Sequence, residues 1–320
     1  MRIASSVEDL LPFSDTGVTI GNFDGVHLGH QALIRRTLEA CREKSLEGVL
    51  VTFRPHPRCV LASQKHIPLG SREGRMKLLA ALGVEKVLEL PFTPEMAALS
   101  AEEFVRRYLL PLGMRCLVVG YDFSLGKNRS GSAGVLRGLG LQYGFTVEQL
   151  APVLLDDGIV SSTRLRRMIA RGDVRGAGRL LGRRYGFSGE VVQGDKRGAG
   201  LGYPTANLAR PEVLLPGDGV YATFVRHGSR RFPAVTNVGQ RPTFGGGYLT
   251  VESFLPGVSI NLYGRSVFLE FVERLREERR FGSAEHLRAQ IALDVERACA
   301  LLSAEGPSYG SADSGCATGW

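Results

Sequence analysis

The order of predicted strands and helices changes near residue 185, and this change constrains the fold more than any other feature. Up to that point, short β-rich runs alternate with helical patterns. The candidate strands are VLVTF (49–53), KVLEL (86–90), CLVVG (116–120) and FTVEQL (145–150), and the candidate helices are 28–44, 71–82 and 100–110. Such alternation predicts a parallel sheet that is covered by helices on both faces.

Two helix starts in this first part carry residues suited to capping. Ser100 stands three residues before Glu103, which is the spacing of a capping box. The stretch Ser161–Thr163 offers hydroxyl side chains for an N-cap, and a helical pattern continues from there through Leu181.

The chain after Tyr185 has the pattern of an antiparallel barrel. Its candidate strands are FSGEVVQ (187–193), GVYATFV (219–225), FPAVTNV (232–238), YLTVESF (248–254) and SVFLEFVERL (266–275). Glycine and proline separate these strands, and residues 283–302 form an amphipathic helix that closes the domain. We therefore predict an α/β domain over residues 1–185, a β-barrel domain over residues 186–305, and a disordered tail over residues 306–320.

The composition indicates which classes of partner this protein is suited to bind. The 320 residues carry a formal net charge of +8, and 43% of them are hydrophobic, which is ordinary for a globular protein. A basic balance suits nucleic acid or anionic small molecules such as nucleotides. No Lys/Arg tract is long enough for a nucleic-acid-binding arm, and the chain has a single Trp, so we favour small anionic substrates and predict no nucleic-acid partner.

The cysteines and the apolar runs indicate an intracellular protein. The five cysteines form an odd count without a C-x-x-C pair, which favours neither a disulfide framework nor a zinc site. The N-terminal residues carry acidic side chains and no long apolar core, and no segment approaches about 18 apolar residues. We expect a cytoplasmic protein without a membrane segment; the sequence predicts nothing about its oligomeric state.

The stretch GNFDGVHLGH (21–30) lies between a short apolar run and a predicted helix. In open parallel sheets, ligands bind beyond the carboxyl ends of the strands, and a helix N-terminus there offers N–H groups to phosphate. Glycines allow a close approach of the backbone, and His27 and His30 share one face of the first turn. Imidazoles can donate to a phosphate in a transition state. The alternative is that both histidines only pack locally.

The wider pattern resembles a known enzyme family. GNFDGVHLGH resembles the H-x-G-H signature of nucleotidyltransferases, and TFRPHP (52–57), GYDFSLGKNRSG (120–131) and SSTRLR (161–166) resemble motifs of FMN adenylyltransferases. Motifs similar to those of riboflavin kinases are GLGYPTANL (200–208), GVYA (219–222), NVGQRPTFGG (237–246), VES (251–253) and LREERRF (275–281). In this order, over about residues 15–300, they resemble the bifunctional riboflavin kinase/FMN adenylyltransferase, the prokaryotic FAD synthetase.

The resemblance implies two reactions and two folds. Riboflavin and ATP give FMN; FMN and a second ATP then give FAD and pyrophosphate. The first domain is expected to be a Rossmann-like nucleotidyltransferase, and the second a riboflavin kinase barrel. ATP is the co-substrate of both steps, Mg²⁺ is the expected cofactor, and the flavins riboflavin, FMN and FAD are substrates and products.

For adenylyl transfer, the family implies that His27 and His30 are catalytic. The ATP-binding residues that it implies are Gly21, Asn22, Phe23, Asp24, Ser162, Thr163 and Arg166. The nucleophile is a phosphate that is already ionised near neutral pH, because its second pKa is about 6. The step therefore needs alignment and charge stabilisation and no general base. The alternative for Ser162 is a helix cap, and for Arg166 a solvated surface charge.

The residues expected to contact the flavin of FMN follow two other motifs. They are Asn128, Phe123, Tyr121 and His56. Asn128 aligns with an asparagine of the family's flavin loop, and the two aromatic side chains can pack on the isoalloxazine ring; local loop packing is the alternative for each. Ser132 stands where many relatives have Asp, and Leu125 where many have Phe.

For the kinase step, Glu252 matches the family's catalytic glutamate. The ribityl hydroxyl must lose a proton, so a general base helps; the alternative is an exposed strand carboxylate. Thr205 and Asn207 lie two apart on an extended segment, so both can face one side. Their neutral oxygens suit Mg²⁺ held mainly by ATP phosphates, whereas local hydrogen bonds after Pro204 are the alternative.

Gly198, Gly200 and Gly202 resemble the flap that covers the ATP phosphates in the kinase. Their spacing is G-x-G-x-G, and Pro204 follows instead of a helix, so the dinucleotide-binding motif does not fit. Ala199 replaces a frequent Arg of the family. Phe254 stands where His is common after the glutamate.

The sequence leaves two alternative functions open. One is a single-activity riboflavin kinase whose adenylyltransferase site has decayed, which intact His27 and His30 disfavour. The other is a nucleotide-sensing or nucleic-acid-binding protein on the same scaffold. Turnover of riboflavin would exclude the second alternative.

Overall fold

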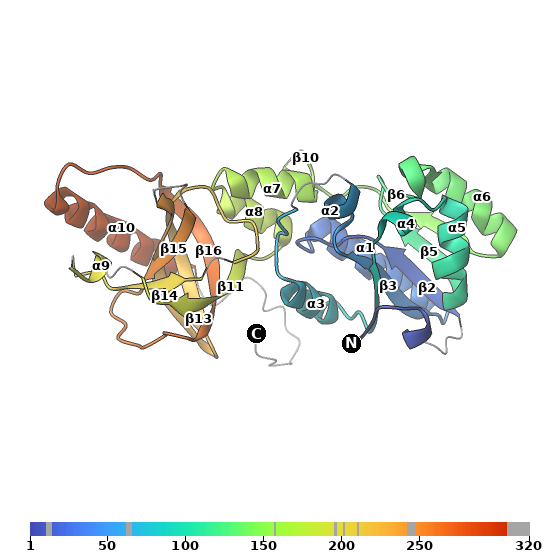
Figure 1. Cartoon of the computed structure of the whole chain (residues 1–320), viewed down its shortest axis with the longest axis horizontal. Coiled ribbons are helices and arrows are strands. Elements are labelled where there is room, and N and C mark those ends of the chain that lie inside the picture. Colours follow the sequence, from blue (N-terminus) through green and yellow to red (C-terminus); the bar gives the residue numbers. More distant parts are fainter. Residues whose placement is uncertain are drawn as a thin grey trace. The chain divides into compact units, whose positions relative to one another are not determined.

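The computed structural model describes residues 1–10, 15–61, 66–156, 158–194, 197–200, 202–209, 211–241 and 248–305. The chain forms two compact units: residues 1–67 with 72–161, and residues 68–71 with the chain from Ser162 onward (Figure 1). The predicted tail over 306–320 and residues 242–246 of the NVGQRPTFGG motif lie outside the described residues.

The first unit is built on a six-stranded sheet in the order β1-β4-β3-β2-β5-β8, and every neighbouring pair is parallel. The strands are β1 (Arg2–Ala4), β2 (Thr16–Ile20), β3 (Glu47–Arg54), β4 (Lys86–Pro91), β5 (Met114–Val119) and β8 (Thr146–Gln149). The predicted parallel sheet is confirmed; β1, which follows no recognisable pattern, extends it beside β4.

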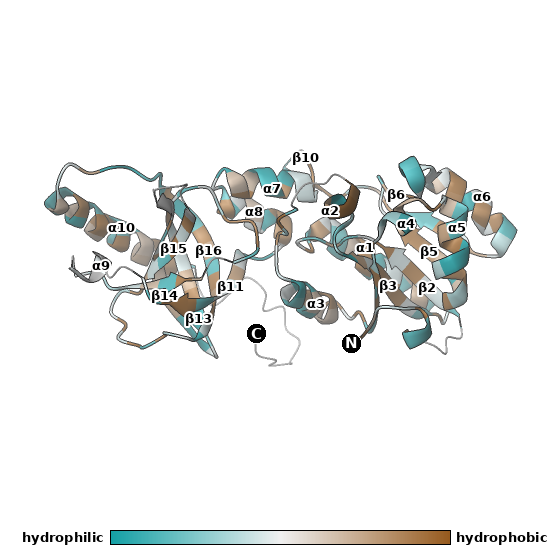
Figure 2. Ribbon diagram, viewed as in Figure 1, coloured by the Kyte–Doolittle hydropathy of each residue, from teal (hydrophilic) through white to brown (hydrophobic). Residues whose placement is uncertain are grey.

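Apolar side chains cover both faces of this sheet because neighbouring strand residues point to opposite sides. In β3, Val49 and Val51 belong to one core and Leu50 to the other. Figure 2 shows the hydrophobic residues along β2 and β3. The helices of this unit are α1 (Leu28–Glu43), α2 (Pro57–Leu61), α3 (Arg72–Ala81), α4 (Pro94–Ala97), α5 (Ala101–Phe104) and α6 (Ala133–Tyr143).

The predicted helix over 100–110 begins as expected and then changes its winding. Ser100 accepts from the Glu103 N–H, and the Glu103 side chain accepts from the Ser100 N–H, which confirms the capping box. A π-helical segment (Val105–Leu109) and a 3-10 turn (Leu110–Leu112) follow α5. Shorter elements are a 3-10 turn at Glu8–Leu10, another at Lys127–Arg129, the hairpin of β6 (Ser124–Leu125) with β7 (Gly131–Ser132), and that of β9 (Leu154–Leu155) with β10 (Gly158–Ile159).

The second unit begins with two helices instead of the single helical stretch predicted through Leu181. Helices α7 (Ser162–Ala170) and α8 (Val174–Leu181) are separated at Gly172, whose φ is +80°. The prediction of one continuous helix was wrong because a residue at this φ cannot continue a right-handed helix. Asp173 accepts from the Gly176 N–H and caps α8. The Arg171–Asp173 tripeptide is therefore a turn between helices.

A closed antiparallel barrel forms the rest of the second unit, in the order β11-β12-β15-β14-β13-β16. Its strands are β11 (Tyr185–Val192), β12 (Thr205–Leu208), β13 (Gly219–His227), β14 (Arg230–Arg241), β15 (Tyr248–Phe254) and β16 (Ser266–Arg276). A short helix α9 (Arg197–Gly200) precedes β12, and α10 (Ala284–Ala304) packs on β13, β14 and β16. The predicted barrel with a closing helix is confirmed.

Aromatic rings fill part of the barrel core. The ring centroid of Phe271 lies 5.3 Å from that of Tyr221 and 5.8 Å from that of Phe187. A chain of buried hydroxyls runs beside them: Thr236 Oγ1 lies 2.7 Å from Thr223 Oγ1 and 2.8 Å from Ser253 Oγ. These polar groups satisfy one another, so they are compatible with burial.

The described cysteines and helices bear on two expectations: the redox state of the thiols and the presence of a membrane-spanning helix. Cys41, Cys59, Cys116 and Cys299 are free thiols, as the sequence predicts, and Cys316 lies outside the described part. Among the described helices, none has the length and apolar character needed to cross a bilayer.

Candidate functional site

The first candidate site lies where the strand order of the parallel sheet reverses. From β2 the chain continues to β3 and β4 on one side of the sheet, and later to β5 and β8 on the other. The carboxyl ends of β2 and β5 therefore flank a topological switch point, which is where ligands bind in open α/β sheets. The GNFDGVHLGH loop follows β2 and the GYDF segment follows β5.

The loop after β2 adopts an uncommon backbone conformation. Phe23 and Val26 have φ values of +49° and +41°, and Gly25 between them has a φ of +81°. Positive φ is strained for a β-branched residue such as Val26. Both nonglycine side chains are almost fully buried, so core packing holds the strained turn in place. Gly21 begins the loop, and its N–H donates to the Val51 carbonyl at 3.1 Å.

His27 and His30 form a stacked pair at the start of α1. Their ring centroids are 3.7 Å apart with an interplanar angle of 16°. The Nδ1 of His27, the N-cap residue, accepts from the His30 backbone N–H at 3.3 Å. A neutral His27 therefore carries its proton on Nε2. An added Cβ at Gly29 would lie 3.2 Å from the His27 ring, so this glycine leaves room for the pair.

Burial favours the neutral form of the His30 ring. Its pKa lies well below the ordinary value, first because burial disfavours the charged form and second because His27 is close; Asp24 acts in the opposite direction. The Nδ1 atom of His30 is buried and has no hydrogen-bond partner among the described residues. A neutral imidazole with an unpaired buried nitrogen can bind a substrate group.

Arg75 is a residue of this site that no sequence pattern singled out. Its Nη1 donates to the carbonyl oxygen of Asn22 at 3.0 Å and its Nη2 to Glu89 Oε1 at 3.0 Å. Burial lowers its pKa, while Glu89 and Asp24 oppose that effect. The Asn22 Oδ1 and the Arg75 Nε are buried without a hydrogen-bond partner in the described structure. Arg75 lies near the start of α3, and only tertiary contact brings it to the loop.

A second stacked pair of histidines lies beside Asp24. His56 and His66 have ring centroids 3.8 Å apart with an interplanar angle of 19°. The His66 Nε2 lies 3.4 Å from Asp24 Oδ2, and both side chains are less than a tenth exposed. His56 was predicted as a flavin contact, whereas His66 was missed because it belongs to no motif.

The loop after β5 carries the other residues expected to contact flavin. Tyr121 is 38% exposed, and its carbonyl accepts from Gln149 Nε2 at 2.8 Å. Phe123 is half-buried against the core on one face of the sheet. Asn128 is exposed and has a φ of +55°. The Ser132 side chain accepts from the Val135 N–H at 3.5 Å and caps α6. Flavin contact by these residues stays a prediction.

The SSTRLR motif forms the start of α7. Ser162 and Thr163 are its first residues, and Arg166 lies one turn later, with Leu165 buried between them. The helix start was therefore predicted correctly. The roles of the three polar residues in binding ATP stay predictions.

In the second unit, residues predicted for the kinase step lie on neighbouring strands. Asn207 of β12 is the register partner of Glu252 on β15, and Asn237 of β14 is its partner on the other side. The Asn207 Nδ2 lies 3.4 Å from Thr205 Oγ1, so these two side chains share one face as the spacing predicted. A Cβ at Gly194 would lie 2.3 Å from the Asn207 side chain, which explains the glycine there.

The glycine segment before β12 folds tightly. Gly198 and Gly200 belong to α9, and Gly202 has a φ of +89°. The Tyr203 N–H donates to the Gly198 carbonyl at 2.8 Å. Tyr203 also makes an edge contact with Phe254 at 5.2 Å between ring centroids. Phe254, a departure from the family pattern, therefore packs against the segment that resembles the flap. The side chain of Ala199 is outside the described part of the structure.

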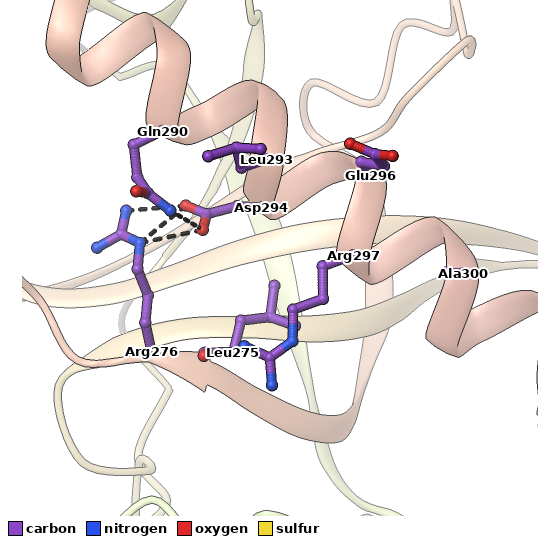
Figure 3. Close-up of a pocket in the computed structure, with 8 residues that line it drawn as sticks. All are labelled: Leu275, Arg276, Gln290, Leu293, Asp294, Glu296, Arg297 and Ala300. Atoms are coloured by element: carbon purple, nitrogen blue, oxygen red, sulfur yellow. Dashed lines mark hydrogen bonds and ion pairs between the residues drawn. The ribbon is translucent and has the colours of Figure 1, made fainter.

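The LREERRF segment runs from the end of β16 toward α10. Figure 3 shows Arg276 reaching from β16 to Asp294 and Gln290 of α10. The Arg276 Nε lies 2.9 Å from Asp294 Oδ2, and Gln290 Nε2 donates to Asp294 Oδ1 at 2.8 Å. These residues line a groove of about 480 Å³ between strand and helix. A Cβ at Gly239 would lie 2.3 Å from Glu278 Oε1, which places this segment against the NVGQRPTFGG motif.

The fold agrees with comparisons to known proteins. Residues 12–164 match the FAD synthetase family and residues 181–302 match the riboflavin kinase family. A curated protein of Pseudomonas fluorescens described as a bifunctional riboflavin kinase/FMN adenylyltransferase is 40% identical over 89% of this chain and 92% of its own length. Its counterpart in Escherichia coli (strain K12) is 36% identical over 92% of this chain and 96% of its own length.

A solved structure covers both parts of the chain. The crystal structure of a Streptococcus pneumoniae protein described as a macrolide-efflux protein superimposes with a TM-score of 0.86 at 32% identity, covering 93% of this chain and 98% of that one. The two family matches occur in the order that the sequence motifs predicted, and the two curated relatives are similar over nearly their whole length. The chain belongs to the bifunctional riboflavin kinase/FMN adenylyltransferase family.

Proposed function

We propose that this protein phosphorylates riboflavin to FMN with ATP and then adenylylates FMN to FAD with release of pyrophosphate. The observation that carries the proposal is that each unit of the chain groups side chains suited to phosphate chemistry. The first unit holds the stacked His27–His30 pair at a switch point, and the second pairs Glu252 with Asn207. The arranged histidines disfavour a kinase with a decayed transferase site.

For adenylyl transfer, we propose that His27 and His30 bind the α-phosphate of ATP, which is the phosphate that reacts. The FMN phosphate attacks the α-phosphate of ATP; the new P–O bond forms as the bond to pyrophosphate breaks. The nucleophile is already ionised, so the protein must align the phosphates and stabilise their charge. Neutral His30, with its unpaired Nδ1, and the Nε2–H of His27 are suited to donate hydrogen bonds there.

The remaining ATP contacts in this proposal come from backbone and polar groups. Gly21–Asp24 precede the N-terminus of α1, where unpaired N–H groups attract phosphate. Ser162, Thr163 and Arg166 are proposed to bind the β- and γ-phosphates. Support comes from the match to the FAD synthetase family, which covers residues 12–164 and so includes Ser162 and Thr163.

For riboflavin phosphorylation, we assign Glu252 as the general base. It accepts the proton of the ribityl hydroxyl while that oxygen bonds to the γ-phosphate and ADP leaves. Thr205 and Asn207 offer two neutral oxygen donors on the same face. These residues fit Mg²⁺, which prefers oxygen ligands and is held largely by substrate phosphates. The ion would neutralise charge that develops on the transferred phosphoryl group.

We also propose the cytoplasm as the site of action and no nucleic-acid partner. Both reactions consume ATP, and the substrates proposed above are all small molecules. The boundary between the two activities is proposed near residue 185, as the composition suggests; α7 and α8 nevertheless pack with the barrel unit.

A direct assay tests the proposed function. The purified chain is incubated with riboflavin, ATP and Mg²⁺, and FMN and FAD are separated over time. Accumulation of FMN followed by FAD is the expected result. FMN without FAD would leave only the kinase activity, and no turnover of riboflavin would contradict the proposal.

A further inference from the structure

A buried contact links the loop after β2 to His66, a residue outside every motif. Asp24 is 6% exposed, and its Oδ2 lies 3.4 Å from the Nε2 of His66. The two positions are more than forty residues apart in sequence, so this contact exists only in the folded chain. A carboxylate at this depth needs a hydrogen-bond donor, since burial without one is costly.

Two contacts orient the His66 ring: His56 lies on its face and Asp24 lies at its edge. His56 stacks on it, with 3.8 Å between the ring centroids. His56 is itself oriented, because its Nδ1 accepts from the Arg58 N–H at 3.2 Å. His66 therefore has little freedom to turn away from Asp24, and the direction of its Nε2–H is set by packing.

Asp24 acts on the groups that surround the phosphate site. Its negative charge raises the pKa of His30 and that of Arg75, in each case against the stronger effect of burial. Arg75 in turn donates to the Asn22 carbonyl in the same loop. Asp24 thus lies within the loop proposed to receive the triphosphate and acts on His30. A carboxylate in this place repels ATP unless its charge is directed elsewhere.

We propose that His66 is a positioning residue for adenylyl transfer, which donates a hydrogen bond to Asp24 and keeps that carboxylate turned away from the triphosphate of ATP. The proposal rests on the function proposed above and adds a residue to its first site. In this proposal, His66 affects the binding of ATP but does not contact the reacting atoms.

The test compares three replacements of His66 in the full-length enzyme with FMN and MgATP as substrates. His66→Phe keeps a ring for stacking on His56 but removes the donor. His66→Gln places an amide N–H near the position of Nε2, and His66→Asn is the matched control whose shorter amide does not reach. We expect the KM for ATP to rise about tenfold to hundredfold in the Phe and Asn variants, with kcat changed less than about threefold. The Gln variant should stay within a few-fold of wild type.

Two further measurements separate positioning from a loss of folding. Riboflavin phosphorylation by the same proteins should be unchanged, because that site lies on the barrel. On an Asp24→Asn background, His66→Phe should raise the KM far less than it does in wild type, because the charge to be restrained is gone. Equal effects on both backgrounds, an unchanged KM in His66→Phe, or a Gln variant as impaired as the Phe variant would overturn the proposal. A wild-type enzyme that makes no FAD would instead refute the proposed function.

Discussion

Glu252 and Asn207 are register partners on adjacent antiparallel strands, β15 and β12. Directly opposed residues on such strands have Cβ atoms about 4.5–5.5 Å apart, so the carboxylate and the amide project to the same side of the barrel wall. Thr205 joins them, because it lies two residues before Asn207 on the same strand. The Glu252 carboxylate is thereby set beside two side chains that carry neutral oxygens.

Replacing Glu252 by Gln should separate the two activities. The amide keeps the size of the side chain but cannot accept the hydroxyl proton, so riboflavin phosphorylation should fall about 10²–10⁴-fold. Adenylylation of supplied FMN should stay near normal, because its nucleophile needs no base. Initial rates of both steps provide the measurement, and Glu190→Gln, an exposed carboxylate on β11, is the matched control. A kinase rate within a few-fold of wild type would leave Glu252 without a catalytic role.

Replacing His30 by Ala should impair adenylyl transfer and spare riboflavin phosphorylation. Loss of a donor to the transition-state phosphate typically costs about 10²–10³ in rate, so conversion of FMN to FAD should drop by that factor while riboflavin phosphorylation persists. His286→Ala, an exposed histidine near the start of α10, is the control. If both steps fall together, a circular dichroism melt will show whether the variant has lost its fold.

The stability of the first unit should fall as the pH is lowered below about 6.5, the ordinary pKa of histidine. The folded-state pKa of His30 is depressed, so between that value and about 6.5 the unfolded chain binds a proton that the folded chain does not. The free energy of unfolding must then decrease with falling pH. Urea unfolding of wild type and His30→Gln at pH 7 and pH 5 measures this. The variant should lose less stability than wild type; parallel losses would contradict the assignment.

Helices α7 and α8 should stabilise the isolated barrel. On α8, Val174, Ala177, Leu180 and Leu181 are buried, and the Gly217 N–H donates to the Ile169 carbonyl of α7 at 3.0 Å. Full burial of one aliphatic side chain contributes about 1.5–3 kcal/mol, so fragment 162–305 should exceed fragment 186–305 in unfolding free energy by at least about 3 kcal/mol.

Both fragments should phosphorylate riboflavin and neither should make FAD. Equal melting temperatures would mean that the helices add nothing to the barrel, and FAD formation by either fragment would show that the sites are assigned to the wrong units.

Breaking the Arg276–Asp294 pair should destabilise the barrel unit. Both side chains are largely buried, so Asp294→Ala leaves a guanidinium without its carboxylate, at a cost of about 3–5 kcal/mol. Glu296→Ala, an exposed carboxylate on the same helix, should change stability by less than about 0.5 kcal/mol. The double variant Arg276→Met with Asp294→Leu should recover part of the loss. Denaturant unfolding measures all three, and equal effects of the two single variants would contradict the pairing.

The sequence alone determined the features that depend on residues close together in the chain. Apolar periodicity predicted most of the parallel strands and most of the barrel strands, and the capping box predicted the start of α5. The H-x-G-H spacing predicted two imidazoles on one helix start, and the Thr205–Asn207 spacing predicted one shared face. Each of these follows from short-range backbone geometry, which a local pattern records.

Only the tertiary structure decided the contacts between distant segments. Strand register places Glu252 opposite Asn207, and the packing of α3 brings Arg75 to the Asn22 carbonyl. The approach of His66 to Asp24 and the grouping of α7 and α8 with the barrel are of the same kind. No local pattern encodes these contacts, because they depend on which apolar faces meet when both cores close.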